Sequence, residues 1–166
     1  MSAYGYQNYV RPGTPNGIEF SYVESKQANA AFDYGDPVFI KAGTPDVAYI
    51  PDSTDATKSF LGVAMLDQKS TKTTFGQYDA GDAVNVGTRG EVWVQIESGL
   101  TTIAGTAAYV YHNVSAGVNH KKFTTNATGT YAVGSIFRTN SVTTTLVING
   151  TLTTIYVAIL ELRGLK

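Results

Sequence analysis

The sequence predicts an all-β protein, either a β-sandwich or a barrel. Short runs rich in β-branched and aromatic residues recur along the chain, and clusters of Gly, Pro, Asn, Asp or Thr separate most of them. This is the pattern of such folds. The length of 166 residues suggests one domain. A chain of this length buries roughly 70% of the surface that its unfolded form exposes, so its core needs neither a metal nor a disulfide.

The first segment is expected to form an extended arm over residues 1–17, with the β-domain over residues 18–166. The stretch AYGYQNYVRPGTPNG contains two prolines, and each of them biases the residue before it to extended geometry. A frayed terminus would also fit. However, a free tail has little use for aromatic side chains, and this segment carries three, which favours a docked arm. These are Tyr4, Tyr6 and Tyr9.

Beyond Gly17 the sequence alternates between expected strands and turns. The first run is IEFSYVE, residues 18–24. The one helix candidate is SKQANAA, residues 25–31, which lacks an apolar stripe and is about two turns long, so at best it forms a short surface helix. The later expected strands are PVFI, VAYI, FLGVAML, AVNV, EVWVQI, AAYVY, YAVGSIF, VTTTLVI and TIYVAILEL.

Three strands are expected to start from the same kind of tight turn. Gly35, Gly81 and Gly105 each precede an Asp or Thr and then an apolar run. Glycine adopts backbone angles that other residues avoid, and Asp accepts hydrogen bonds from nearby amides in turns. The GTRG stretch, residues 87–90, is interpreted as another turn, between AVNV and EVWVQI. The unequal spacings exclude a regular repeat array.

Side-chain alternation assigns the strand EVWVQI to a sheet with one buried face. Val92, Val94 and Ile96 share the core face, and the single tryptophan, Trp93, lies on the polar face. In TIYVAILEL both alternating sets are apolar, which predicts a central strand covered on both sides.

Aromatic residues on outward faces suggest either internal cover or an interface. In AAYVY, Tyr109 and Tyr111 share the face opposite Val110. A loop or a second sheet would explain these residues and Trp93 equally well as an interface patch, in which Trp and Tyr are enriched.

Charge and composition exclude several function classes. The net charge is −1 and no concentrated basic face is evident, which argues against binding to nucleic acid through phosphate contacts. No cysteine is present, so disulfides and thiolate metal sites are excluded. No apolar run approaches a membrane span or a signal-peptide core, so a soluble protein made without a cleaved secretory signal is expected. Charged residues are only 15%, which fits either a partner-covered surface or a neutral polar one.

No constellation of catalytic, cofactor-binding or metal-binding residues is evident. His112 and His120 fit no metal-ligand spacing. The nucleophile-elbow and phosphate-loop motifs are absent. The expectation is a structural or binding protein with no enzymatic activity and no cofactor.

The order of motifs resembles that of the structural cement proteins of tailed bacteriophages. The motifs are YGDPVFI, FLGVAML, YDAGDAVNVGTRGEVWV, AGTAAYVYHN, YAVGSIFRT and YVAILEL, and the resemblance covers roughly residues 17–162. It implies a jelly-roll-like β-sandwich or barrel that decorates the outer capsid surface of the virion and stabilises the shell without covalent bonds. It also implies synthesis in the host cytoplasm and no catalytic residues.

The expected partners are the major capsid protein and further copies of the chain, as a dimer or trimer, with neither nucleic acid nor membrane. A carbohydrate- or receptor-binding β-sandwich of a phage fibre is the alternative, because Trp93, Tyr109 and Tyr111 could stack on sugar if polar groups converged beside them. The residues expected at a capsid or oligomer interface are Tyr4, Tyr6, Tyr9, Arg11, Trp93 and Tyr109.

Overall fold

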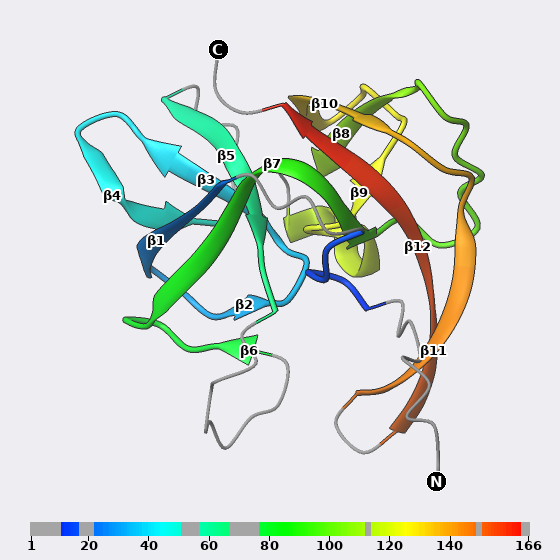
Figure 1. Ribbon diagram of the computed structural model, residues 1–166, viewed down its shortest axis with the longest axis horizontal. Helices are drawn as coiled ribbons and strands as arrows, with labels where there is room; N and C mark the ends of the chain where they lie inside the picture. Colours follow the sequence, from blue (N-terminus) through cyan, green and yellow to red (C-terminus); the bar gives the residue numbers. More distant parts are fainter. Residues whose placement is uncertain are drawn as a thin grey trace, which may run out of the picture.

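Twelve β-strands and one short 3₁₀ helix, η1, make up the regular structure of the described residues (Figure 1). The computed structural model describes residues 11–16, 22–50, 57–66, 77–111, 114–148 and 151–163. The elements are β1 (Tyr22–Ala28), β2 (Phe32–Asp33), β3 (Pro37–Lys41), β4 (Thr44–Tyr49), β5 (Lys58–Ala64), β6 (Gln77–Tyr78), β7 (Ala83–Gln95), β8 (Ala107–Tyr111), η1 (Val114–Asn119), β9 (Phe123–Thr124), β10 (Thr130–Phe137), β11 (Val142–Ile148) and β12 (Thr151–Arg163).

The strands close into two small rings that share the long strand β7. In the first ring the order is β1-β4-β3-β5-β7, and pairing of β1 with β7 closes it. In the second the order is β7-β12-β10-β8-β9, and a bridge between Ile96 and Phe123 returns β9 to the end of β7. The predicted all-β class with a barrel-type core is therefore confirmed. In the described residues no helix is long and apolar enough to cross a membrane.

Each ring encloses its own apolar cluster, and alternating side chains of β7 pack into both clusters. Val84 and Val86 contribute to the first cluster, and Val92, Val94 and Ile96 to the second. The last three are at most 1% exposed, which confirms the side-chain alternation predicted for EVWVQI.

Alternation along β3 joins the two clusters. Val38 points into the first cluster, while its neighbour Phe39 packs in the second. The Phe39 ring lies 5.1 Å from that of Tyr131 on β10, measured between centroids. The two rings of strands are therefore one continuously packed body.

Strand β12 is buried on both faces along its second half, as its sequence predicts. Ala158 and Leu160 face the second cluster, and Val157 and Ile159, at 0% and 5% exposed, lie on the opposite face. Central strands covered on both sides carry such continuous apolar runs.

The three glycine turns are confirmed and share one geometry. Gly35, Gly81 and Gly105 have φ angles of 90°, 92° and 89°, in the region that only glycine occupies at low cost. In each turn the amide after the glycine donates to the carbonyl three residues earlier, at 3.1 Å. The same turn geometry thus precedes β3, β7 and β8.

The turn expected at residues 87–90 is wrong, because β7 runs without interruption through that stretch. The glycines there serve close approach between strands. A Cβ on Gly62 of β5 would lie 2.0 Å from the carbonyl oxygen of Gly87, and a Cβ on Gly87 would lie 2.6 Å from Sδ of Met65. Because neither Gly62 nor Gly87 has a side chain, β5 and β7 can approach closely enough to pair where the two rings meet.

The helix candidate at residues 25–31 is also wrong. Residues 25–28 belong to β1, which pairs antiparallel with β7, for example Lys26 with Val84. The Lys26 ammonium lies 3.1 Å from the Glu24 carboxylate. Tertiary pairing overrides a weak local preference in so short a segment. The 3₁₀ helix η1 arises instead in VSAGVN, a stretch without a helical apolar pattern.

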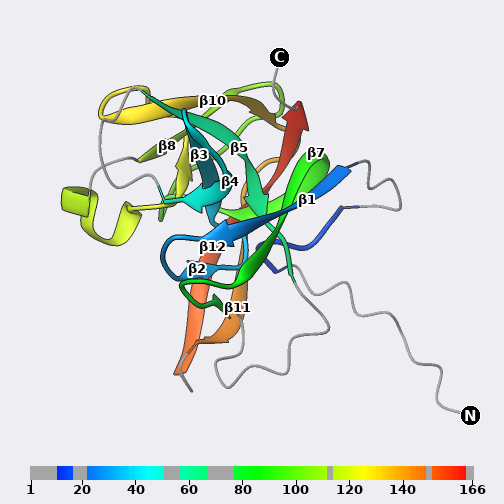
Figure 2. The same cartoon turned by 90° about the vertical axis from the view of Figure 1, so that its left-hand side faces the viewer.

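A two-stranded hairpin extends beyond the rings. Strand β11 pairs with residues 151–157 of β12, whereas β7 and β10 pair with β12 only from Val157 onward. Figures 1 and 2 show β11 and the adjoining part of β12 projecting from the rest of the sheet.

Candidate functional site

Residues 11–16, the last part of the predicted arm, lie along β7 like an added strand. The Gly13 amide donates to the Trp93 carbonyl at 2.8 Å, and the Trp93 amide donates to the Thr14 carbonyl at 2.9 Å. The Asn16 amide donates to the Glu91 carbonyl at 2.9 Å. The arm is therefore fastened to its own β-domain at this point. The proposed boundary at residue 17 falls outside the described residues.

Two glycines allow this segment to sit close to the first ring. Gly13 has a φ of 78°, and a Cβ there would lie 2.8 Å from the carbonyl oxygen of Ala64. A Cβ on Gly35 would lie 2.3 Å from Cβ of Pro12. The Gly13 carbonyl also accepts a 2.9 Å hydrogen bond from the Leu66 amide. Residues 11–13 are thus wedged against the turn that starts β3.

Three of the six predicted interface residues, Arg11, Trp93 and Tyr109, lie within the described residues. Tyr4, Tyr6 and Tyr9 lie outside the described residues. Arg11 is half-buried at the start of the fastened segment. Trp93 is half-buried on the outward face of β7, on the side predicted from alternation, and is directly opposite Ile159 of β12.

Tyr109 is half-buried on β8, which is not a paired neighbour of β7. Strands β12 and β10 separate these two strands on one side of the ring, and β9 separates them on the other. Trp93 and Tyr109 therefore do not share a pair of adjacent strands, which disfavours a single sugar-stacking platform built from both.

Tyr111 has an internal role, because its hydroxyl donates to the Glu97 carboxylate at 3.1 Å. The same carboxylate accepts hydrogen bonds from Asn119 Nδ2 at 3.1 Å and from Thr124 Oγ1 at 2.7 Å. Glu97 therefore ties η1 and β9 to the end of β8. For Tyr111, this hydrogen bond favours cover by the same chain over an interface role.

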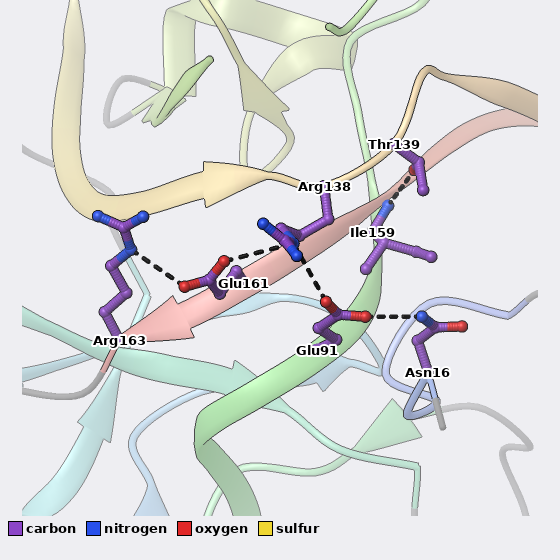
Figure 3. Close-up of polar contacts among 7 residues, drawn as sticks. All are labelled: Asn16, Glu91, Arg138, Thr139, Ile159, Glu161 and Arg163. Carbon is purple, nitrogen blue, oxygen red and sulfur yellow. Dashed lines mark hydrogen bonds and ion pairs between the residues drawn. The ribbon is translucent and has the colours of Figure 1, made fainter. Parts of the chain in front are cut away.

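A strip of alternating charges crosses the outward face of β7 and β12 (Figure 3). Glu91 and Glu161 are directly opposite each other in the strand register. Arg138 Nε lies 3.2 Å from Glu91 and 3.4 Å from Glu161, and Arg163 Nε lies 3.3 Å from Glu161. Asn16 Nδ2 donates to the other Glu91 oxygen at 2.8 Å.

The charged strip is a neutral, half-exposed structure. It balances two arginines with two glutamates, so it creates no basic field of the kind that nucleic-acid binding requires. Exposed ion pairs of this type contribute about 0–1 kcal/mol each. The sequence alone did not reveal the strip, because nothing in it indicates that β7 pairs with β12.

Another ion pair, between Asp36 and Lys121, joins the two rings. Lys121 Nζ lies 3.2 Å from Asp36 Oδ2, and the same oxygen accepts a 2.9 Å hydrogen bond from the Asp33 amide. The Asp36 side chain is only 12% exposed. Burial raises the pKa of Asp36 to about 7, while the positive charge of Lys121 acts in the opposite direction. Asp36 is thus a structural carboxylate, as its turn position indicates.

Replacing Lys121 with methionine should destabilise the protein more at pH 8 than at pH 5. The pKa of Asp36 is about 7 in the folded protein, against an ordinary value of 3.8 for aspartate. The folded chain therefore binds this proton more tightly, and the contribution of Asp36 to stability falls as pH rises from about 4 to about 7. Without Lys121 a buried carboxylate stands unpaired at pH 8, which costs about 3 kcal/mol.

Chemical denaturation at both pH values measures this difference, and Asp36→Asn is the matched background. In that background, Lys121→Met should show no additional dependence on pH. Equal losses for Lys121→Met at pH 5 and pH 8 in the parent chain would contradict the role assigned to the ion pair.

No group of three or more His, Asp or Glu side chains within the described ranges is placed to hold a metal ion. The arrangement on the described surface consists of hydrogen-bonded strands, ion-paired carboxylates and half-buried aromatics.

Comparison with known proteins identifies a family and a fold. The family model described as "Structural cement protein (E217 gp24/Pam3 gp6)" matches residues 2–157. No curated protein matches the chain. Among solved structures, a chain of "The capsid of Myoviridae Phage XM1" is similar with a TM-score of 0.70 and 17% sequence identity, covering 93% of this chain and 91% of that chain. At this identity the likeness shows a shared fold.

Proposed function

Because the chain belongs to the structural cement protein family of bacteriophages, we propose that it binds the outer surface of the major capsid shell and stabilises that shell without covalent bonds. Family membership gives the coarser role directly, that of a capsid-associated cement protein of the virion. The observation that carries the proposal is the match over residues 2–157, nearly the whole chain. The role is structural, and no catalytic step is proposed.

The proposed partners are the major capsid protein and sister copies of this chain, in a dimer or trimer. Neither nucleic acid nor a membrane is proposed, in keeping with the net charge of −1. Synthesis in the host cytoplasm precedes assembly onto the outer surface. Many identical attachment sites on a capsid would let modest interfaces act together through avidity.

The proposed interface combines the arm with the face beside it. Gly13 and Thr14 are hydrogen-bonded to the backbone of Trp93, so the described part of the arm lies beside that residue. This favours Trp93 acting with Arg11 and the arm tyrosines, while Tyr109 would serve a separate contact. The proposed residues remain Tyr4, Tyr6, Tyr9, Arg11, Trp93 and Tyr109.

Binding to undecorated capsids should survive moderately raised salt. Arg11 is the one charged residue among the six proposed interface residues, and the charges of the charged strip are already paired. Salt mainly weakens exposed charge pairs, so apolar and neutral hydrogen-bonded contacts persist. Co-sedimentation with capsids at 50 mM and 500 mM salt should give affinities within about threefold of each other, because no net charge contact is lost.

A pair of variants tests the location of the interface in the same assay. Trp93→Ser should weaken binding by about tenfold or more, as expected for a central aromatic contact. Ile103→Ser is the matched control, because Ile103 is 66% exposed, lies on the loop before β8 and is not one of the proposed interface residues. Failure of the wild-type protein to sediment with capsids would overturn the proposed function. Equal binding by both variants would remove Trp93 from the interface.

A further inference from the structure

Among the residues that the structure describes, strand β11 presents an unpaired edge on a part of the sheet that has only two strands. Within the described residues β11 hydrogen-bonds to β12 alone, over seven residue pairs from Val142–Val157 to Ile148–Thr151. A two-stranded ribbon is marginally stable in water unless a third strand or another surface supports it. The projecting hairpin (Figure 2) is therefore incomplete as a free structure.

The sequence of the same hairpin lacks the charged residues and prolines that normally protect an edge. Residues 139–160 contain no charged side chain and no proline. Val142 is 44% exposed and Leu152 is 73% exposed. Natural proteins usually blunt a free edge with lysine, proline, a bulge or a cover. An edge with none of these in its sequence is suited to receive another strand.

The N-terminal arm has the complementary chemistry. Residues 1–10, MSAYGYQNYV, also contain no charged side chain and no proline. Tyr4 and Tyr6 would share one face of an extended strand, where they could pack against Val142 and its neighbours. The first ten residues are long enough to pair with all seven residues of β11.

The extended length of the arm favours pairing with a neighbouring copy over pairing with its own β11. The amide and carbonyl of Trp93 are both bonded to residues 13–14, so the arm starts on the edge of β7 opposite β12. From there to a position beside β11 is four strand spacings, about 19 Å, and the length of β11 adds about 23 Å. Ten residues span at most about 33–36 Å, so an arm cannot line the whole β11 edge of its own copy.

We propose that residues 1–10 of one copy add as a strand to the free edge of β11 in a second copy, so that neighbouring cement proteins are linked by exchanged arms. This deepens the proposed function and rests on it, because the exchange would occur between copies seated side by side on the capsid. The backbone hydrogen bonds supply affinity, and the tyrosines supply selectivity.

Cysteine pairing tests the exchange, since the chain has no cysteine of its own. Single variants Tyr4→Cys and Tyr6→Cys are each mixed with Thr143→Cys or Thr144→Cys, which lie on opposite faces of β11. Each mixture is oxidised in free solution and on decorated capsids. Disulfides form only between Cβ atoms about 4 Å apart, so testing four pairs allows for either strand register. Ala104→Cys, an exposed loop position, is the control partner.

The expected result is a covalent heterodimer with at least one β11 position and none with Ala104→Cys. Thr143→Lys places a charge on the edge and should reduce the yield several-fold without lowering the melting temperature. Heterodimers absent both in solution and on capsids would overturn the exchange, and so would a monomeric internal disulfide in a Tyr6→Cys/Thr144→Cys double variant without any linked dimer. Capsid co-sedimentation of the same variants, scored separately, reports on the proposed function itself.

Discussion

Replacing Val94 with aspartate should abolish soluble folding. Val94 is fully buried in the second cluster, and it pairs with the equally buried Ala158 of β12. A carboxylate there would be ionised without a partner or would have to stay protonated, and either state costs several kcal/mol. The whole stability of a domain this size is about 5–15 kcal/mol, so one such substitution in shared strand β7 removes most of it.

Gln95→Asp is the matched control for this prediction. Residue 95 is the next position along the same strand, but its side chain is half-buried on the outward face. Circular dichroism and thermal unfolding of the soluble fraction compare the two variants. If Val94→Asp melted like the wild type, the side-chain register of β7 would be wrong.

Deleting residues 2–9 should leave the fold intact and weaken capsid attachment by at least tenfold. The deletion spares residues 11–16, whose hydrogen bonds to Trp93 and Glu91 complete the edge of β7. The three tyrosines are lost, and each offers a large apolar area at a modest entropic cost. A tenfold loss corresponds to about 1.4 kcal/mol.

A longer deletion, of residues 2–13, separates the two roles of the segment. It removes the Gly13 amide that bonds to Trp93 and the Gly13 carbonyl that accepts from Leu66. The longer deletion should therefore lower the melting temperature as well as capsid binding, whereas the shorter one should affect binding alone. Unchanged capsid binding by the shorter variant would remove the arm from the interface.

Local alternation and turn chemistry carried most of the fold prediction. The core positions of β7 and the two covered faces of β12 follow from the period of two. The direction in which a side chain points is set by its position along its own strand, whichever strands lie beside it. The glycine turns before β3, β7 and β8 were equally predictable, since a φ near 90° strongly favours glycine wherever the strands lie.

Features that depend on which strands meet were not predictable in this way. Residues 87–90 resembled a turn because glycines also serve close approach, and only the crossing of Gly62 with Gly87 distinguishes the two roles. The sequence of residues 25–28 resembled that of a short helix, and only the pairing of β1 with β7 shows that these residues form a strand.

The ion pairs could not be predicted from the local sequence for the same reason. Arg138 meets Glu91 and Glu161 from positions 47 and 23 residues away in sequence, so no local pattern marks them. The predicted site residues were chosen by residue type on outward faces. The structure shows that Gly13 and Thr14 of the arm are hydrogen-bonded to Trp93. It also shows that Tyr109 lies on a strand that is not paired with β7.

The most direct test of reinforcement is to strip the protein from capsids, add it back, and measure the temperature at which the capsids release DNA. Fully decorated capsids should release DNA at a higher temperature than bare ones, and re-addition should restore the original value. The variant lacking residues 2–9 should restore less of it at equal protein concentration. Equal release temperatures for bare and fully decorated capsids would contradict the claim that this chain acts as a cement.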